Sequence, residues 1–458
     1  MSRAAVSLTT SVPPSTPHVR ARFALAVPGR SILRAAVVAS LCATAGACGG
    51  ERASGEALYA EIVADVVPRL EKQLGMPFKT PPKVESRSRE EVKAFVMAQL
   101  TSERARTQLE GQQSAYRILG LIPDTLQLMG LLQRLLEEQI VGYYDPKTKT
   151  LYVVDGATKL LLEQTVTHEL VHALQDQYVP IDSIQASVDD ADRSAAAQAI
   201  LEGQAVFESL RLDENAGPML KMPGGWDRIR DVIRDGQGGM PVFSSAPRAV
   251  REGLLFPYLG GADFVRRFIE QRPAKELLTD LPVSTKQILN DAAYFTGDRA
   301  SRDMPTAVTL PAPAKGTVSY TNGFGEFETR LILVQHLKDD AVARRGGGGL
   351  DGDRYAVIEL PAGEALVWAT VWDSPVDAAD FLDLMGDAAR RRYEIGRQDI
   401  PPGATSRTLS APAAGSREAR TVSLRLEQIG GRPVVLFVDA PASVGTSLID
   451  AAKITLSN

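Results

Sequence analysis

One short stretch of the chain could both hold and use a metal ion. It reads His168-Glu169-Leu170-Val171-His172, an HExxH pattern in a chain with only four histidines. Residues 160–175 contain no proline or glycine, so we expect a helix there. Residues four apart share a helix face, and two neutral imidazoles so placed can share one Zn²⁺ ion. Glu169 would then lie beside the two ligands, where its carboxylate could act as general base towards the attacking water.

A catalytic zinc needs a third protein ligand and one open position. The longer HExxHxxGxxH form is absent, because Gln175 and Tyr178 stand where its glycine and third histidine would be. We expect the third ligand to be Glu202, whose helical neighbours are mostly apolar (Ala195, Ala199, Ala205, Val206). A buried carboxylate is costly unless it is paired or binds a metal. Gly203 would allow a second helix to approach closely, whereas Glu208, beside Gln204 and Arg211, is expected to be a solvated surface acid.

Several other residues are weaker candidates for a role at this site. Asp176 shares a face with His172 and could accept its second N–H, or could equally face water. Asp189, Asp190 or Asp192 could serve instead, although capping the next helix is the simpler interpretation. Tyr258 and Tyr294 could donate a hydroxyl to a tetrahedral intermediate, but aromatic core packing is favoured for both. We expect His336 to be structural or exposed, and Trp368 and Trp372 to pack in a core.

The elements that must position this site follow from periodicity and turn chemistry. Helices are expected at Glu56–Leu74 (kinked or ended by Pro68), after a Ser88/Glu91 capping box, and at Leu126–Gln139, Lys159–Gln177 and Asp192–Leu212. Ile140–Tyr144 and Thr150–Val154 flank the turn Asp145–Thr148 and predict a β-hairpin. Residues 213–255 carry glycine and proline clusters and are expected to be irregular.

The chain changes character near residue 316, where alternating elements predict a separate α/β or α+β domain. Strands are expected at Tyr355–Leu360, Ala365–Trp372, Val422–Leu426 and Val434–Val438, with a helix at Asp377–Arg391. The glycine run Arg345–Leu350 lacks the residues of a phosphate-binding loop and is expected to be a flexible surface loop.

These motifs resemble the gluzincin metallopeptidases, which carry HExxH on one helix and a glutamate ligand on the next. The segments GYYDPKTKTLY, HELVHALQDQ and LEGQA, with FPY at 256–258 and STKQIL at 284–289, look like a group of poorly described bacterial envelope metallopeptidases. The resemblance covers roughly residues 85–300. It implies a zincin-like domain with one Zn²⁺ ion held by His168, His172 and Glu202, and Glu169 as the catalytic residue.

The same resemblance implies how a peptide would be bound and cut. Zinc-assisted hydrolysis is expected, with Thr150–Val154 as an edge strand on which an extended substrate could pair. Relatives are expected to carry a histidine where Asn290 stands, so the group that would stabilise an oxyanion is left open. The implied fold is α+β, with a helical N-terminal part, a zincin-like core and the separate C-terminal domain.

The first 48 residues have the features of an export signal. Their charges are all arginines, followed by the apolar run Ala35–Leu41 and small residues ending at Cys48. Cys48 resembles the lipidated cysteine of a bacterial lipobox, although plain cleavage is the alternative. Removing five arginines leaves 46 basic against 56 acidic residues, and Cys48 as the only sulfhydryl. We expect a signal peptide (1–48), a helical region (49–139), a metallopeptidase core (140–312) and the C-terminal domain (316–458).

Composition narrows the class of protein further. With 458 residues, 44% hydrophobic and 23% charged, the chain is an ordinary globular protein. A formal net charge of −5 offers no basic field for nucleic acid. The leading hypothesis is an exported zinc metallopeptidase in the cell envelope, anchored to the membrane by a lipid and acting on peptide or protein substrates. The alternatives are a non-catalytic envelope lipoprotein that retains the scaffold, and an amidase acting on wall peptides.

Overall fold

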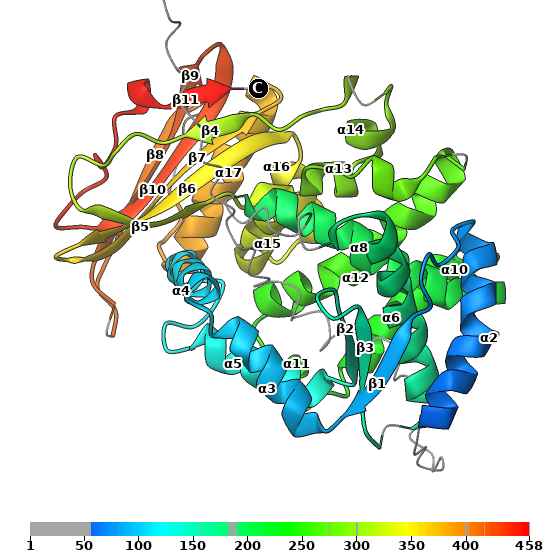
Figure 1. Ribbon diagram of the computed structural model, residues 1–458. Coiled ribbons are helices and arrows are strands. Elements are labelled where there is room, and N and C mark those ends of the chain that lie inside the picture. Colours follow the sequence, from blue (N-terminus) through cyan, green and yellow to red (C-terminus); the bar gives the residue numbers. More distant parts are fainter. Residues whose placement is uncertain are drawn as a thin grey trace, which may run out of the picture.

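The structure is a computed structural model of the chain. It describes residues 56–457 except 157, 182–183, 185–189, 274, 299–300, 399–400, 402 and 416. The expected signal peptide, with the candidate lipid-attachment residue Cys48, lies outside the described residues, as does Asp189. The described chain has a helical N-terminal part and a C-terminal sheet domain, which confirms the expected α+β class (Figure 1). None of the described helices combines the length and the apolar run needed to cross a bilayer.

The N-terminal part contains four helices and one strand. These are α2 (Glu56–Leu74), β1 (Lys83–Arg87), α3 (Arg89–Leu100), α4 (Glu103–Ile118) and α5 (Leu128–Gln139). Pro68 lies inside α2, which continues to Leu74, so this proline does not end the helix. The capping box precedes α3, because the Ser88 N–H donates to Glu91 Oε2 at 2.9 Å and the Glu91 N–H donates to Ser88 Oγ at 3.3 Å.

A small sheet lies beside these helices. The predicted hairpin is confirmed as β2 (Gly142–Asp145) and β3 (Thr150–Val154), with Asp145 Oδ1 accepting the Lys147 N–H in the turn. β1 pairs with β3 in parallel, so the strand order is β1-β3-β2 and β3 is central. The expectation that β3 is an edge strand is therefore wrong. All five β3 residues are buried, as a strand covered on both sides requires.

The helical core that follows holds the HExxH segment. Its elements are α6 (Lys159–Tyr178), α8 (Ala191–Leu212), α9 (Ala216–Leu220), α10 (Gly225–Gln237), α11 (Pro241–Ser245), α12 (Arg248–Gln271), α13 (Thr285–Leu289) and α14 (Asp291–Phe295). The expectation of irregular chain over residues 213–255 is wrong. The glycines and prolines there begin short helices: Gly224 precedes α10 with φ +66°, and Pro241 is the first residue of α11.

Helices α8 and α12 cross at two glycines. A Cβ atom on Gly203 would lie 2.1 Å from the Gly261 carbonyl carbon, and one on Gly261 would lie 1.9 Å from the Ala199 oxygen. Only glycine permits this separation, as the sequence predicted for Gly203. The crossing fixes the helix that carries Glu202.

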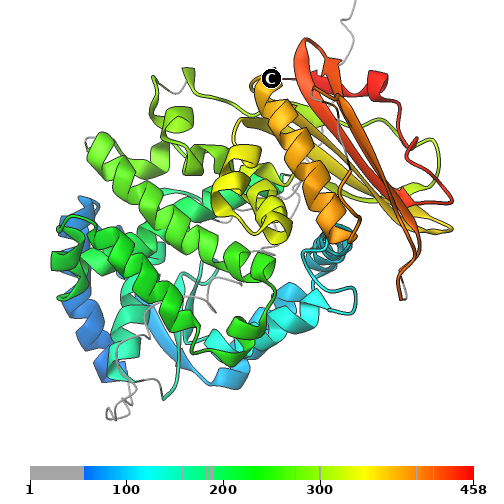
Figure 2. The same ribbon diagram turned by 180° about the vertical axis from the view of Figure 1, so that it is seen from behind.

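The C-terminal domain is an antiparallel sheet of six strands in the order β5-β6-β7-β10-β9-β8. The strands are β5 (Thr317–Asn322), β6 (Leu350–Leu360), β7 (Gly363–Trp372), β8 (Ser406–Ala411), β9 (Arg420–Ile429) and β10 (Arg432–Pro441). One face packs against α15 (Gly325–Leu337), α16 (Asp340–Gly347) and α17 (Pro375–Arg392). The other face is covered by β4 (Ala307–Thr309) and β11 (Thr455–Ser457), and the two views show these layers (Figures 1 and 2).

The glycine run of this domain is ordered structure. α16 extends to Gly347 and β6 begins at Leu350, with Gly346 and Gly347 buried. A Cβ on Gly346 would lie 2.7 Å from Leu384 and 2.8 Å from Leu333, so the glycines let α16 pack tightly. The expectation of a flexible surface loop at Arg345–Leu350 is wrong.

Candidate metal centre

Helix α6 brings both imidazoles of the HExxH segment to one point. It begins at the N-cap Thr158, whose Oγ1 accepts the Leu161 N–H, and it continues without a break past the motif. The two Nε2 atoms of His168 and His172 lie 3.1 Å apart, and their ring planes are inclined by 78°. Both side chains are buried, at 1% and 4% exposed. One helical turn therefore places two nitrogen donors side by side in the interior.

Helix α8 supplies an oxygen donor to the same point. Glu202 Oε2 lies 3.3 Å from His168 Nε2 and 3.4 Å from His172 Nε2, and Glu202 is fully buried. The HExxH spacing predicted the two histidines, and the apolar neighbours of Glu202 predicted the third ligand. The structure brings the three residues together. They form one of two groups among the described residues whose potential ligand atoms cluster closely enough to hold a metal ion.

The donor triangle has the dimensions of a zinc site. Zinc ligands lie about 2.0–2.1 Å from the ion, so two tetrahedral donors are about 3.3 Å apart. The three separations here are 3.1, 3.3 and 3.4 Å. Two imidazoles and one carboxylate are also a donor set that zinc accepts at catalytic sites. The residues therefore fit a single zinc ion with one coordination position left to water or substrate.

Glu169 directly follows His168 on α6 and is held by the neighbouring sheet. Its Oε2 accepts the backbone N–H of Tyr144 at 2.8 Å, and the residue is 3% exposed. Tyr144 lies on β2, an edge strand of the small sheet, so β2 rather than β3 faces the site. The hydrogen bond fixes one carboxylate oxygen of Glu169.

Two acids differ from their expected roles. Asp176 is held by the small sheet and its turn: its Oδ2 accepts from the Tyr144 hydroxyl at 2.8 Å and pairs with Lys149 Nζ at 2.6 Å. The imidazole partner is Gln175, whose Oε1 lies 2.9 Å from His172 Nδ1. Gln175 lies three residues after His172. The sequence drew attention to it only because it stands where the longer HExxHxxGxxH form has a glycine.

Glu208 is buried at 1% exposed, so the expected solvated acid is wrong. Burial raises its pKa, while Arg211 and Gln73 oppose the rise. Its Oε2 accepts from Gln73 Nε2 at 2.6 Å and pairs with Arg211 at 2.8 Å. Helix α2, which supplies Gln73, covers the part of α8 that carries Glu208. The residues around Glu208 in the sequence do not indicate this contact.

Of the remaining candidates, Tyr258 and Tyr294 are core residues, and Asp190 and Asp192 lie at the start of α8. Tyr258 is buried in the main hydrophobic core, as favoured, with its ring centroid 6.3 Å from that of His168. The Tyr294 hydroxyl instead donates to the Asp280 carbonyl at 2.5 Å within an aromatic cluster, and burial raises its pKa to about 12. Asp190 caps α8 by accepting the Arg193 N–H at 2.9 Å, as the simpler interpretation held. Asp192 is bound by Thr285, whose N–H donates to it at 3.0 Å.

Four further residues singled out from the sequence, Asn290, Trp368, Trp372 and His336, have partners outside the group of candidate metal ligands. Asn290 Nδ2 is 3.0 Å from both carboxylate oxygens of Glu326 on α15. Trp368 and Trp372 are fully buried in the sheet domain, as expected. His336 is structural, with its Nε2 bound to the Leu119 carbonyl at 2.7 Å.

A cavity of about 770 Å³ reaches His168. α2, α6, α8, α9 and α10 enclose it, and its apolar wall includes Ile62, Val66, Leu210, Met219, Val232 and Ile233. The same lining holds five carboxylates, on Glu61, Asp65, Glu163, Asp213 and Glu214, against two cations, on Arg69 and Lys159. The volume lies within the range of roughly 300–1,000 Å³ that is usual for ligand sites. A space with an apolar wall and an excess of acidic residues therefore adjoins one candidate metal ligand, His168.

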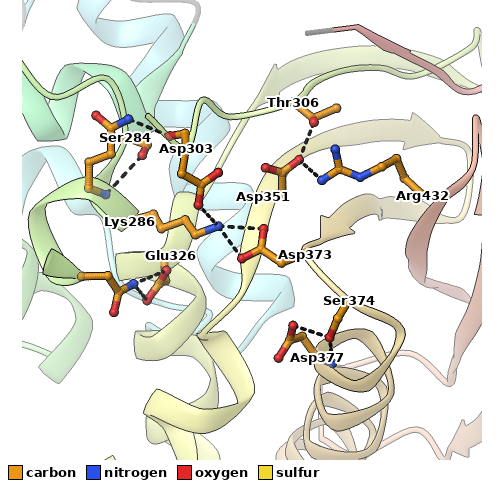
Figure 3. A network of polar contacts seen from close by, with 12 residues as sticks. Ser284, Lys286, Asp303, Thr306, Glu326, Asp351, Asp373, Ser374, Asp377 and Arg432 are labelled. Carbon is orange, nitrogen blue, oxygen red and sulfur yellow. Dashed lines mark hydrogen bonds and ion pairs between the residues drawn. The ribbon is translucent and has the colours of Figure 1, made fainter. Parts of the chain in front are cut away.

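The second close group of acids is an ion-pair network. Asp303, Asp351 and Asp373 have carboxylate oxygens within 4.8 Å of one another. Figure 3 shows the Lys286 ammonium between Asp303 and Asp373, at 2.6 and 2.7 Å, while Arg432 pairs with Asp351 at 2.5 Å. Each of the three carboxylates is already paired with Lys286 or Arg432, so we do not assign a metal to this group.

Comparison with known proteins gives matches that each cover only part of this chain. Residues 316–444 match a family model described as "Domain of unknown function (DUF8575)", which covers less than a third of the chain. No curated protein matches. Among solved structures, the chain is similar to one described as "a putative hydrolase with a novel fold" from Chloroflexus aurantiacus. The two share 20% identity over 57% of this chain and 94% of that one, with a TM-score of 0.33, a likeness too low to carry an argument.

Proposed function

We propose that the protein is a zinc-dependent peptidase, similar to gluzincins, that hydrolyses peptide bonds. The observation that carries the proposal is the buried donor triangle of His168, His172 and Glu202, with the next residue after His168, Glu169, fixed by the Tyr144 N–H. A structural metal site would not require Glu169, a buried, hydrogen-bonded carboxylate within the motif that does not itself belong to the metal-binding group. That fourth residue is what a hydrolytic reaction adds to a metal site.

The chain's own residues account for the proton transfers. His168, His172 and Glu202 would hold a zinc ion, which would supply a Lewis acid able to polarise a carbonyl and to lower the pKa of water to about 7. Glu169 removes the proton from the attacking water and later delivers it to the leaving amine. The Tyr144 N–H holds the Glu169 carboxylate in place, so little reorganisation is needed at each transfer.

The cavity beside His168 supports a polypeptide segment as substrate. Its apolar wall can accept hydrophobic side chains, and its excess of carboxylates favours basic over acidic neighbours. Its volume is larger than one side chain needs, which suits a short stretch of chain. We propose that cleaved segments carry bulky apolar residues with basic residues nearby.

The proposal is tested by replacing Glu169 with glutamine. The variant should keep about one zinc per chain and lose peptide hydrolysis by roughly 10²–10⁴-fold, because only the general base is removed. Zinc is measured by atomic absorption and hydrolysis with a casein or peptide-library assay. Glu270→Gln, at a 59% exposed glutamate on α12, is the matched control and should remain active. Zinc binding with no hydrolysis in the wild type, or unchanged hydrolysis in Glu169→Gln, contradicts the proposal.

We also propose that the protein is exported and anchored by a lipid on Cys48. The support is the arginine-rich leader, the short apolar run and the small residues before that cysteine. Mass spectrometry of the N-terminus of the protein isolated from its host should show a diacylglyceryl-modified cysteine. A mature protein that begins with an unmodified residue contradicts the anchor.

A further inference from the structure

The amide of Gln175 connects the two helices that carry the candidate metal ligands. We infer that Gln175 is a positioning residue, which fixes the tautomer of His172 and sets the distance between α6 and α8. The inference rests on the proposed metal site for its purpose. Its evidence is a hydrogen-bond network whose donors and acceptors can be assigned one by one.

The orientation of the Gln175 amide is determined by a backbone carbonyl. Its Nε2 lies 3.0 Å from the Leu201 oxygen, which can only accept a hydrogen bond. Nε2 also lies 2.9 Å from Gln204 Oε1. A flipped amide would place two oxygens against each other at the Leu201 carbonyl, so the flip is excluded. Gln175 Oε1 must therefore face His172.

The orientation of this amide decides where His172 carries its proton. Gln175 Oε1 can only accept, and it lies 2.9 Å from His172 Nδ1. The neutral imidazole must then be protonated on Nδ1, which leaves the lone pair on Nε2. Nε2 is the atom that faces His168 and Glu202, at 3.1 and 3.4 Å. The glutamine thus presents the ring with its lone pair directed at the metal-binding point.

The same side chain holds the ligand helix in place. Leu201 and Gln204, which receive its two N–H groups, flank Glu202 on α8. All of these residues are buried, so the hydrogen bonds are shielded from water. One amide therefore orients a ligand on α6 and fixes the backbone next to a ligand on α8. In many zinc sites a carboxylate or a backbone carbonyl orients the histidine; here a neutral amide does so.

His336 provides an internal reference for the tautomer. Its Nε2 lies 2.7 Å from the Leu119 carbonyl, so this imidazole must be protonated on Nε2. The structure therefore assigns opposite tautomers to His172 and His336. Nitrogen-15 NMR distinguishes them, because protonated and unprotonated ring nitrogens resonate far apart.

The test uses metal-free protein labelled with ¹⁵N-histidine, at a pH well above the usual histidine pKa of about 6.5. The four histidines are assigned by replacing them one at a time. We expect an Nδ1–H signal for His172 and an Nε2–H signal for His336. An Nε2–H tautomer at His172 overturns the inference, and the spectrum decides this even if the wild type binds no zinc and cleaves no peptide.

A pair of glutamine variants tests the effect on the metal. Gln175→Ala should weaken zinc binding by about 10–100-fold and give mixed His172 tautomers. Gln177→Ala is the matched control, because that glutamine lies on the same helix and bonds the backbone of Lys79 and Thr80 at 2.6 and 2.9 Å, away from the site. It should leave zinc affinity and tautomers unchanged. Equal zinc affinity in Gln175→Ala and wild type, or equal losses in both variants, overturns the positioning role.

Discussion

Two buried glutamates on α8 show how the contacts of a carboxylate set its role. Glu208 forms an ion pair with Arg211 and accepts a hydrogen bond from Gln73, so its burial is compensated within the protein. Glu202 is fully buried and faces two imidazoles at 3.3 and 3.4 Å. A metal ion held between these groups would balance its charge. The two residues share a helix and a chemical type, which makes them a natural comparison.

The amide variants of these residues should separate ligation from burial. Glu202→Gln replaces a charged ligand by a neutral one and should weaken zinc binding by roughly a hundredfold or more, since even indirect partners contribute 10–100-fold. Glu208→Gln should change zinc affinity by no more than about twofold, because Glu208 does not face the imidazoles. Affinity is measured by competition with a chelator of known strength. Comparable losses in both variants would mean that helix distortion, not ligation, explains the effect.

Pattern and burial arguments could predict the metal ligands but not their partners. His168, Glu169 and His172 follow from one helical spacing, and Glu202 from the cost of burying a charge among apolar neighbours. Asp176 and Glu208 were misjudged because their contacts come from distant segments, Tyr144 and Lys149 for the first and Gln73 for the second. Helical periodicity contains no information about such contacts. For the same reason it did not identify Gln175, whose partners lie on α8.

At the scale of elements, the contact between α8 and α12 controls where Glu202 lies. The two helices touch through Gly203 and Gly261, backbone against backbone. Gly253, also on α12, has open space where a Cβ would be. Sequence reasoning predicted the role of Gly203, but it could not identify α12 as the partner helix.

Adding one methyl group at this crossing should disturb both stability and the site. Gly203→Ala should lower the free energy of unfolding by about 1–3 kcal/mol through overpacking and also weaken zinc binding. Gly253→Ala should be neutral or stabilising by up to about 1 kcal/mol, as expected for an unhindered helical position. Denaturant titrations and zinc competition measure the two effects. An unaltered zinc affinity in Gly203→Ala would show that the crossing does not position Glu202.

The cavity beside His168 gives a second prediction for elements. Val232, on α10, is 54% exposed and lines the cavity, so a charge there should be tolerated by the fold. Val232→Asp should raise KM at least about tenfold for substrates with bulky apolar residues, since it adds a charge to an apolar wall. Val376→Asp, at a 70% exposed valine on α17, is the control and should leave KM unchanged. Identical KM values in the two variants would place the substrate elsewhere.

At the scale of the whole molecule, part-buried polar contacts join the sheet domain to the helical part. His336 on α15 bonds the Leu119 carbonyl near the end of α4, and Lys286 on α13 pairs with Asp373 at the end of β7. Burial, with smaller effects from Arg392 and Lys338, lowers the pKa of His336 to about 4, although its hydrogen bond to Leu119 opposes the shift. This imidazole is therefore neutral in the folded protein at pH values where it is charged in the unfolded chain.

The sign of the resulting pH dependence follows from proton binding. Between pH 6.5 and 4 the unfolded chain binds the extra proton, so stability is lost as the pH falls through this range. The loss from His336 should reach about 3 kcal/mol at pH 4 relative to His336→Gln, which cannot titrate but keeps an N–H donor. Tryptophan fluorescence follows unfolding of the sheet domain, which contains Trp368 and Trp372. Parallel stability curves for the two proteins over this pH range would contradict the assignment.

The overall architecture was only partly accessible from the sequence. Strongly periodic segments such as α2, α6 and α8 were predicted nearly to the residue, and the core strands of the sheet domain were recognised by their apolar runs. β1 was missed because its residues, KVESR, have little strand character, and its pairing with β3 joins segments more than sixty residues apart. The short helices between residues 213 and 255 were missed because their glycines and prolines begin helices instead of interrupting them.

The central claim is that one zinc ion lies where α6 and α8 meet. Anomalous scattering measured on crystals at the zinc absorption edge tests it directly, together with the metal content of the same protein. The account predicts one zinc per chain, with a single anomalous peak bounded by His168, His172 and Glu202. Crystals without bound zinc, or a peak at another position such as the Asp303, Asp351 and Asp373 group, would contradict it.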